Sequence, residues 1–79
     1  MSAEIRVPKM GMDTTEVIVS HWLVKVGDSV EVGTPLVELE SEKTIFVLDS
    51  QVGGRIISIA HLDGSVVPVG EPLGTIETT

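Results

Sequence analysis

The 79-residue sequence contains no cysteine, so neither a disulfide nor a cysteine-based metal site can stabilise it. Its only aromatic residues are Trp22 and Phe46, too few to form a stacking platform for nucleic-acid bases. Basic residues are also scarce, with five Lys and Arg against twelve Asp and Glu and a net charge of −7. This balance argues against partners such as nucleic acid or an anionic membrane. An acidic surface is compatible with binding to basic patches on protein partners. It would equally well serve only to keep a small domain soluble.

Long hydrophobic runs are absent as well. No stretch approaches the ~20 consecutive apolar residues of a membrane-spanning helix, and residues 1–4 lack the basic and apolar regions of a signal peptide. We therefore expect a cytoplasmic location. A chain of this length is near the lower limit for a self-sufficient core, so we expect residues 1–79 to form a single domain.

Short apolar runs rich in β-branched residues, separated by Gly, Pro, Asp and Ser, predict an all-β fold. The expected strands cover residues 4–7, 17–24, 29–30, 36–40, 44–49, 54–59, 66–67 and 73–77. No window shows sustained helical periodicity.

The second half of the sequence nearly repeats the first, because residues 63–77 resemble residues 26–40 at an offset of 37. The identical pairs are Gly27/Gly64, Val30/Val67, Val32/Val69, Gly33/Gly70, Pro35/Pro72, Leu36/Leu73 and Glu40/Glu77. The four glycines are expected at turns that need positive φ, and the two prolines at strand starts. The repeat predicts a flattened β-barrel or sandwich of two four-stranded sheets with pseudo-twofold symmetry. It also places the link between the repeats and the chain ends at opposite ends of the molecule.

Lys43 lies in the link between the repeats and has no counterpart. If Glu42 and Lys43 are the loop residues of a hairpin, Glu40 pairs with Ile45. This register decides which side chains of the hairpin point to each face of the sheet. The side chains expected on the core face of this hairpin are Val37, Leu39, Phe46 and Leu48. Ser41 favours a type I turn, whereas two-residue hairpins normally need Gly-containing primed turns. Such a departure from local preference is typical of functional residues, although a solvated charged turn would look the same.

Lys43 is not expected to be a catalyst by itself. An exposed lysine is mostly protonated and is a poor nucleophile, and Glu40 and Glu42 favour the charged form further. A lysine modified by another enzyme needs only to be reachable. Elsewhere, His21 and His61 are not joined by ligands at metal-binding spacing, and no phosphate loop or Ser/His/Asp group is present. We therefore predict no catalytic residue and no metal site.

These residues carry a family resemblance. The chain resembles the lipoyl domain of 2-oxo acid dehydrogenase complexes, in which an acidic residue, Thr or Ser, a second acidic residue and the modified lysine occur in sequence, as in Glu40-Ser41-Glu42-Lys43. Residues 7–16, Trp22 with residues 26–30, and the second half from residues 53–56 through 70–73 match other parts of the family pattern, so the resemblance covers essentially the whole chain. Val17 and Thr44 depart from it, where the family commonly has Gly and Ala, which bears on loop geometry and partner preference.

The resemblance implies lipoate joined by an amide to Lys43, added by a lipoate ligase or lipoyl transferase. The group would accept an acyl unit from a thiamine-diphosphate-dependent dehydrogenase and deliver it to coenzyme A at an acyltransferase domain. A flavin-dependent dihydrolipoamide dehydrogenase would reoxidise it. The domain would be a monomeric, non-catalytic part of an acyltransferase component, in a pyruvate- or acetoin-type complex. Met10 and Met12, in the loop 9–15, would either contact the dehydrogenase or pack over the edge of the fold.

Two alternatives remain open from the sequence. A biotin carrier domain shares this fold and the hairpin lysine, but its lysine typically lies in an Ala-Met-Lys-Met run, whereas Glu42 and Thr44 flank Lys43 here. An unmodified structural or adaptor module could use the same repeats. The lipoate carrier of glycine cleavage is longer than this chain.

Overall fold

The computed structural model describes residues 1–9 and 14–78, and the fold of these residues is all-β. The strands are β1 (Ser2–Arg6), β2 (Glu16–Trp22), β3 (Ser29–Val30), β4 (Pro35–Glu40), β5 (Ile45–Asp49), β6 (Gly54–Ile59), β7 (Val66–Pro68) and β8 (Pro72–Thr78). Each corresponds to a strand expected from the sequence, with ends that differ by one or two residues at most. A search of the described residues finds no helix of the length and apolar character that a membrane crossing requires.

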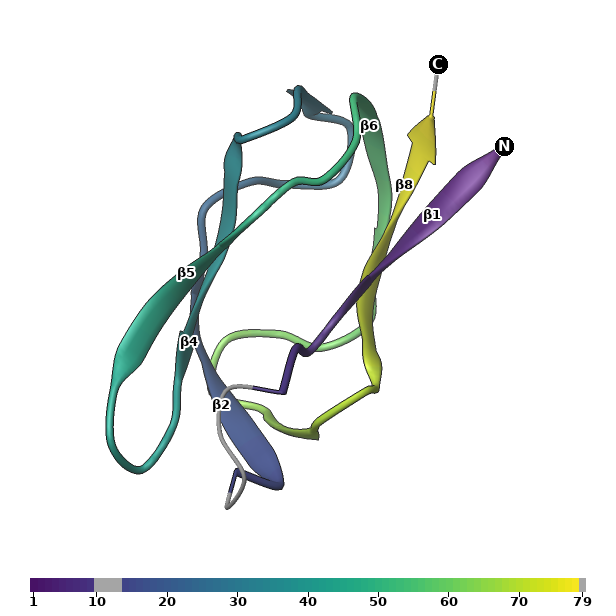
Figure 1. Cartoon of the computed structure of the whole chain (residues 1–79). Helices are drawn as coiled ribbons and strands as arrows, with labels where there is room; N and C mark the ends of the chain where they lie inside the picture. The colour runs from purple at the N-terminus through teal and green to yellow at the C-terminus, as the bar shows by residue number, and fades with distance from the viewer. Residues whose placement is uncertain (10–13, 79) are drawn as a thin grey trace.

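The strands form two four-stranded antiparallel sheets, with the orders β1-β8-β6-β3 and β5-β4-β2-β7 (Figure 1). We call the second the hairpin sheet, because it contains the β4–β5 hairpin. The sheets pack face to face as a flattened sandwich and do not close into a barrel. Alternate residues point into the shared core, as Val17 and Val19 do from the hairpin sheet and Ile56 and Ile76 from the opposite sheet. The all-β, two-sheet prediction is therefore confirmed, in its sandwich form.

The two sheets are related by the predicted pseudo-twofold symmetry. The strands β2, β3 and β4 correspond to β6, β7 and β8 at the sequence offset of 37. Both β2 and β6 are bulged at the same repeat position, at Ser20 and Ile57. The remaining strands, β1 and β5, also correspond, since Ser2 pairs with Glu77 as Ile45 pairs with Glu40.

The repeated glycines make the same corners twice. Gly27 and Gly64 have φ of 99° and 91°, and Gly33 and Gly70 both have φ of 91°. Because residues with a Cβ rarely adopt this conformation, the glycines fix the turns before and after β3 and, in the second repeat, before and after β7. The expectation of positive φ at these four positions is confirmed.

The termini and the β4–β5 hairpin lie at opposite ends of an elongated molecule (Figure 1), with extents of 35 × 21 × 18 Å. At one end β1 and β8 run side by side, and the N–H of Thr78 donates to the carbonyl oxygen of Met1 at 2.8 Å. The hairpin occupies the pseudo-equivalent place at the other end. A chain attached at its ends would thus present the hairpin away from the attachment.

Candidate functional site

The β4–β5 hairpin has the register expected from the sequence. Leu39 pairs with Phe46 and Glu40 with Ile45, and the N–H of Ser41 donates to the carbonyl oxygen of Thr44 at 2.8 Å. Glu42 and Lys43 are therefore the two tip residues. The predicted core-facing residues of the hairpin are indeed the less exposed set: Val37 and Leu39 are buried, and Phe46 and Leu48 are partly buried.

The side chain of Ser41 organises the tip. Its Oγ accepts hydrogen bonds from the N–H groups of Thr44 and Lys43, at 3.2 and 3.4 Å, and donates to the carbonyl oxygen of Thr44 at 3.2 Å. Among the described residues no residue other than Gly has positive φ, so Glu42 and Lys43 do not form a primed turn. A serine side chain that satisfies backbone groups two and three residues later suits a turn of the type I class.

Lys43 is exposed at this tip. In the part of the chain that the structure describes, its ammonium takes part in no ion pair or hydrogen bond. The neighbouring carboxylates of Glu40 and Glu42 are partly exposed and exposed, respectively. The amine is therefore reachable from solvent, with acidic groups on its N-terminal side.

A shallow groove of about 380 Å³ runs beside the hairpin. Its lining residues are Thr14, Thr15, Glu16, Val17, Ile18, Glu40, Ser41 and Glu42. The described end of the 9–15 loop, Thr14 and Thr15, thus lines the same groove as the hairpin. Met10 and Met12 lie outside the described residues. Ile18 also lines this groove, and the sequence does not indicate it, because its place there depends on the pairing of β2 with β4.

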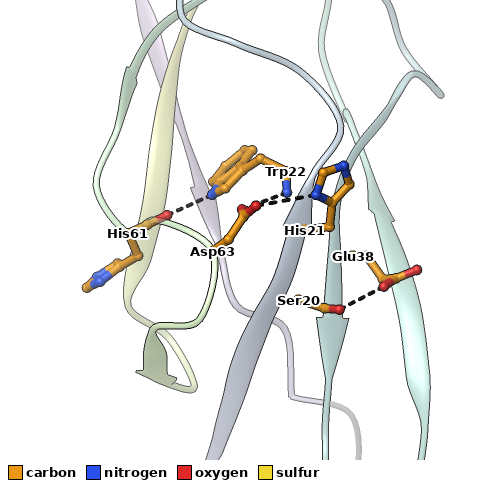
Figure 2. A network of polar contacts seen from close by, with 6 residues as sticks. All are labelled: Ser20, His21, Trp22, Glu38, His61 and Asp63. Atoms are coloured by element: carbon orange, nitrogen blue, oxygen red, sulfur yellow. Dashed lines mark hydrogen bonds and ion pairs between the residues drawn. The ribbon is translucent and has the colours of Figure 1, made fainter.

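Both histidines lie where the end of β2 meets the loop between β6 and β7 (Figure 2). His21 Nδ1 is 3.3 Å from Asp63 Oδ2, and the N–H of Trp22 donates to Asp63 Oδ1 at 3.0 Å. The indole Nε1 of Trp22 donates to the carbonyl oxygen of His61 at 2.7 Å. These contacts join β2 to the loop between β6 and β7; His21 takes part through its ring and His61 through its backbone carbonyl.

Comparison with known proteins supplies the context for this site. The family model described as "Biotin-requiring enzyme", for the biotin/lipoyl family, matches residues 3–76. The succinyltransferase component of the 2-oxoglutarate dehydrogenase complex of Bartonella vinsonii subsp. berkhoffii is 40% identical over 77 residues, which cover 98% of this chain. The acetyltransferase component of the pyruvate dehydrogenase complex of Mycobacterium bovis is 40% identical over 72 residues, which cover 91%. Both are named as acting on dihydrolipoyllysine residues.

The matches cover very different shares of the compared proteins. The chain spans 19% of the Bartonella protein and 13% of the Mycobacterium protein. By contrast, it matches a whole solved domain, the lipoyl domain of the 2-oxoglutarate dehydrogenase complex from Azotobacter vinelandii. That match has a TM-score of 0.79 and 26% identity, and it covers 96% of this chain and 98% of the other.

Proposed function

The chain belongs to the biotin/lipoyl-attachment family as a lipoyl-type domain, and we propose that it carries lipoate in amide linkage to Lys43. The observation that supports this proposal most directly is the placement of Lys43. It is an exposed lysine at the tip of an ordered hairpin, at the end of the sandwich opposite the termini.

The tip residues fit covalent attachment. The amide would form between Lys43 Nζ and the activated carboxyl carbon of lipoate: the ammonium first gives a proton to a base, and the resulting amine attacks the carbon, loses a second proton and displaces the activating group. The domain supplies an accessible amine, and the Ser41 hydrogen bonds hold the backbone on which that amine is presented. The modifying enzyme must supply the base and the activation, because a protonated surface lysine is a poor nucleophile.

The residues that flank Lys43 favour lipoate over biotin. Glu42 precedes Lys43 directly and Thr44 follows it, whereas the biotin carriers that the chain resembles have methionines at both positions. The named relatives act on dihydrolipoyllysine residues, which points in the same direction.

The domain is a carrier and not a catalyst. When bound, lipoate supplies a disulfide that can take up an acyl group and two electrons. The chain's own residues present that group at one end of a rigid sandwich and leave the other end for attachment to further polypeptide. The partners that we propose are a thiamine-diphosphate-dependent dehydrogenase, an acyltransferase domain, a dihydrolipoamide dehydrogenase, and a lipoate ligase or lipoyl transferase.

The substrate of the parent complex is a further proposal. The opening residues 9–11 favour a pyruvate- or acetoin-type complex, and one of the two relatives described above belongs to a pyruvate dehydrogenase complex. The other belongs to a 2-oxoglutarate dehydrogenase complex at the same identity, so the choice is left to experiment.

Intact-mass spectrometry tests the attachment. Incubation with a lipoate–protein ligase, lipoate and ATP should add one lipoyl group to the wild-type domain and none to Lys43→Ala. Lys9→Ala, which removes another exposed lysine, is the matched control and should still gain one group. Biotin added by a biotin ligase in place of lipoate, or a lipoyl group on Lys43→Ala, would overturn the assignment.

A further inference from the structure

The outer face of the hairpin sheet carries a row of apolar side chains. The register aligns Ile45 of β5 with Glu40 of β4, Glu40 with Ile18 of β2, and Ile18 with Val66 of β7. Directly paired residues point to the same side of a sheet. Ile45, Ile18 and Val66 are 57%, 41% and 54% exposed, so this row, which we call the outer row, faces solvent.

The internal symmetry provides a control for this row within the same molecule. On the opposite sheet, the equivalent positions are Ser2, Glu77, Arg55 and Ser29, which are aligned in the same way and are all exposed. The opposite sheet therefore folds with serine and arginine at the positions where the hairpin sheet has isoleucine and valine. The sandwich itself does not require apolar residues in the outer row.

Charge distinguishes the two outer faces as well. The strands of the hairpin sheet contain Glu16, Glu38, Glu40 and Asp49 but no Lys or Arg. The strands of the opposite sheet balance Glu4 and Glu77 with Arg6 and Arg55. Val47, which is 46% exposed, adds a further apolar side chain beside Glu38. The face of the hairpin sheet is thus both apolar and acidic, which is complementary to a surface that is apolar and basic.

This face is continuous with the attachment site. The outer row begins at Ile45, two residues after Lys43, and Ile18 and Glu40 also line the groove beside the hairpin. With strands about 4.8 Å apart, the row extends roughly 14 Å across the sheet from Ile45 to Val66. A protein that reaches the tip from this side would cover the row.

We propose that the outer row is the docking surface for the enzyme that attaches lipoate to Lys43, through a patch of that enzyme in which apolar side chains are bordered by Lys or Arg. The inference rests on the proposed function and names the partner for one step of it. Before modification, only the four-carbon side chain of Lys43 separates the reacting amine from the backbone. The attaching enzyme must therefore come up against the hairpin itself, whereas partners that act after attachment meet a longer arm.

The symmetry supplies the test variant. Ile45→Ser, Ile18→Arg and Val66→Ser together place on the outer row the residues that the opposite sheet already has at the equivalent positions. With a lipoate–protein ligase, lipoate and ATP, we expect the KM for this variant to rise about tenfold or more, while kcat changes less than twofold. Circular dichroism and urea unfolding should show that the variant is folded.

The matched control lies on the opposite sheet. Ile57 is 43% exposed there and corresponds to Ser20 of the hairpin sheet. Ile57→Ser likewise removes an exposed apolar side chain and introduces the residue of the other repeat. It should leave KM within twofold of the wild-type value.

A salt series tests the charge complementarity separately. Ser20 Oγ donates to Glu38 Oε2 at 2.8 Å, and Gln can accept the same bond, so Glu38→Gln removes charge with little change of shape. The wild-type KM should rise with added NaCl, and the rise should be smaller for Glu38→Gln, because screening then has less attraction to remove.

The outcomes separate docking from attachment. An unchanged KM for the outer-row variant would overturn the docking proposal and leave the attachment to Lys43 intact. A wild-type domain that self-associates, together with a monomeric variant of unchanged KM, would instead assign the row to a contact between copies of the chain. Failure of the wild-type domain to gain any lipoyl group would overturn the attachment, and the docking proposal with it.

Discussion

The backbone N–H of Trp22 donates a hydrogen bond to Oδ1 of Asp63 at 3.0 Å. This bond fastens the end of β2, in the hairpin sheet, to the loop that leads from β6 to β7 (Figure 2). The indole N–H of Trp22 donates a second hydrogen bond to the same loop, to the carbonyl oxygen of His61. Trp22 in turn packs against the buried core cluster. Asp63 therefore helps to hold a connection between the two sheets.

Replacement of Asp63 should cost more stability than replacement of its histidine partner. Asp63→Ala leaves the N–H of Trp22 without its acceptor, and we expect the free energy of unfolding to fall by about 1 kcal/mol. His21→Ala removes only the exposed His21–Asp63 contact, which should contribute less than about 0.5 kcal/mol. Urea unfolding followed by tryptophan fluorescence measures both. Equal losses for the two variants would show that the His21–Asp63 side-chain contact, and not the backbone hydrogen bond, holds the loop.

Gly53, just before β6, and Gly54, the first residue of β6, should respond very differently to replacement by alanine. A Cβ at Gly54 would lie 2.1 Å from the carbonyl oxygen of Glu77 and 2.9 Å from Cγ2 of Ile76. Strands β6 and β8 would have to separate, so Gly54→Ala should lower the free energy of unfolding by about 3 kcal/mol. At Gly53 the nearest atom is 3.8 Å away, which is ordinary contact distance.

Gly53→Ala is therefore the matched control for Gly54→Ala. It should change stability by less than about 0.5 kcal/mol, as measured in the same urea titration. If both variants lose stability to the same extent, the close approach of β6 and β8 at Gly54 is not the cause.

Much of the fold could be predicted because two features of the sequence agree. The internal repeat and the alternation of apolar and polar residues both indicate the same strands. Val17 and Val19 alternate with exposed residues as a half-buried strand requires, and the repeat of residues 26–40 in residues 63–77 predicts matching strands at β4 and β8. The pairing of Ile45 with Glu40 followed from placing two residues in the hairpin loop. The end of β2 differs from the prediction: the strand ends at Trp22 and not at residue 24, where the N–H of Trp22 donates to Asp63 in the β6–β7 loop.

The candidate site was only partly readable from the sequence. Lys43 stood out because the repeat gives it no counterpart and because its neighbours are poor hairpin residues. The outer row did not stand out, because Ile18 and Val66 are 48 positions apart in the sequence and meet only through the pairing of β2 with β7. Exposed isoleucines also look like core residues until the bulge and register show which side each one faces.

The Ser41 side chain should matter more for modification than its partner Thr44 does. Ser41→Ala removes the acceptor of the Lys43 and Thr44 N–H groups, and we expect the rate of lipoylation to fall about threefold to tenfold as the tip loses its fixed shape. Thr44 Oγ1 has one long hydrogen bond of 3.4 Å, to the carbonyl oxygen of Ile45. Thr44→Ala should therefore lipoylate within twofold of the wild-type rate.

A lipoylation time course by intact-mass spectrometry, with both variants at the same concentration, makes this comparison. The loss for Ser41→Ala should appear without a large loss of stability, since the tip is exposed and the cost of an exposed hydrogen bond is only about 0.5–1 kcal/mol. A reduced rate for Thr44→Ala together with a normal rate for Ser41→Ala would contradict this prediction, because it would show that the side chain of Thr44, and not that of Ser41, organises the tip.

Exchange of the two tip residues tests whether position or exposure alone selects the lysine. Glu42→Lys combined with Lys43→Glu keeps the composition and the net charge but moves the amine by one residue along the turn. The side-chain direction changes at each position of a tight turn, so the amine of the exchanged domain should point away from the place that the attaching enzyme reads. We expect lipoylation to fall at least tenfold, measured as the rate of mass increase.

The single variant Glu42→Gln, which leaves Lys43 in place, should be lipoylated much faster than the exchanged domain. Full-speed labelling of the exchanged domain would show that the hairpin contributes exposure but no positional information.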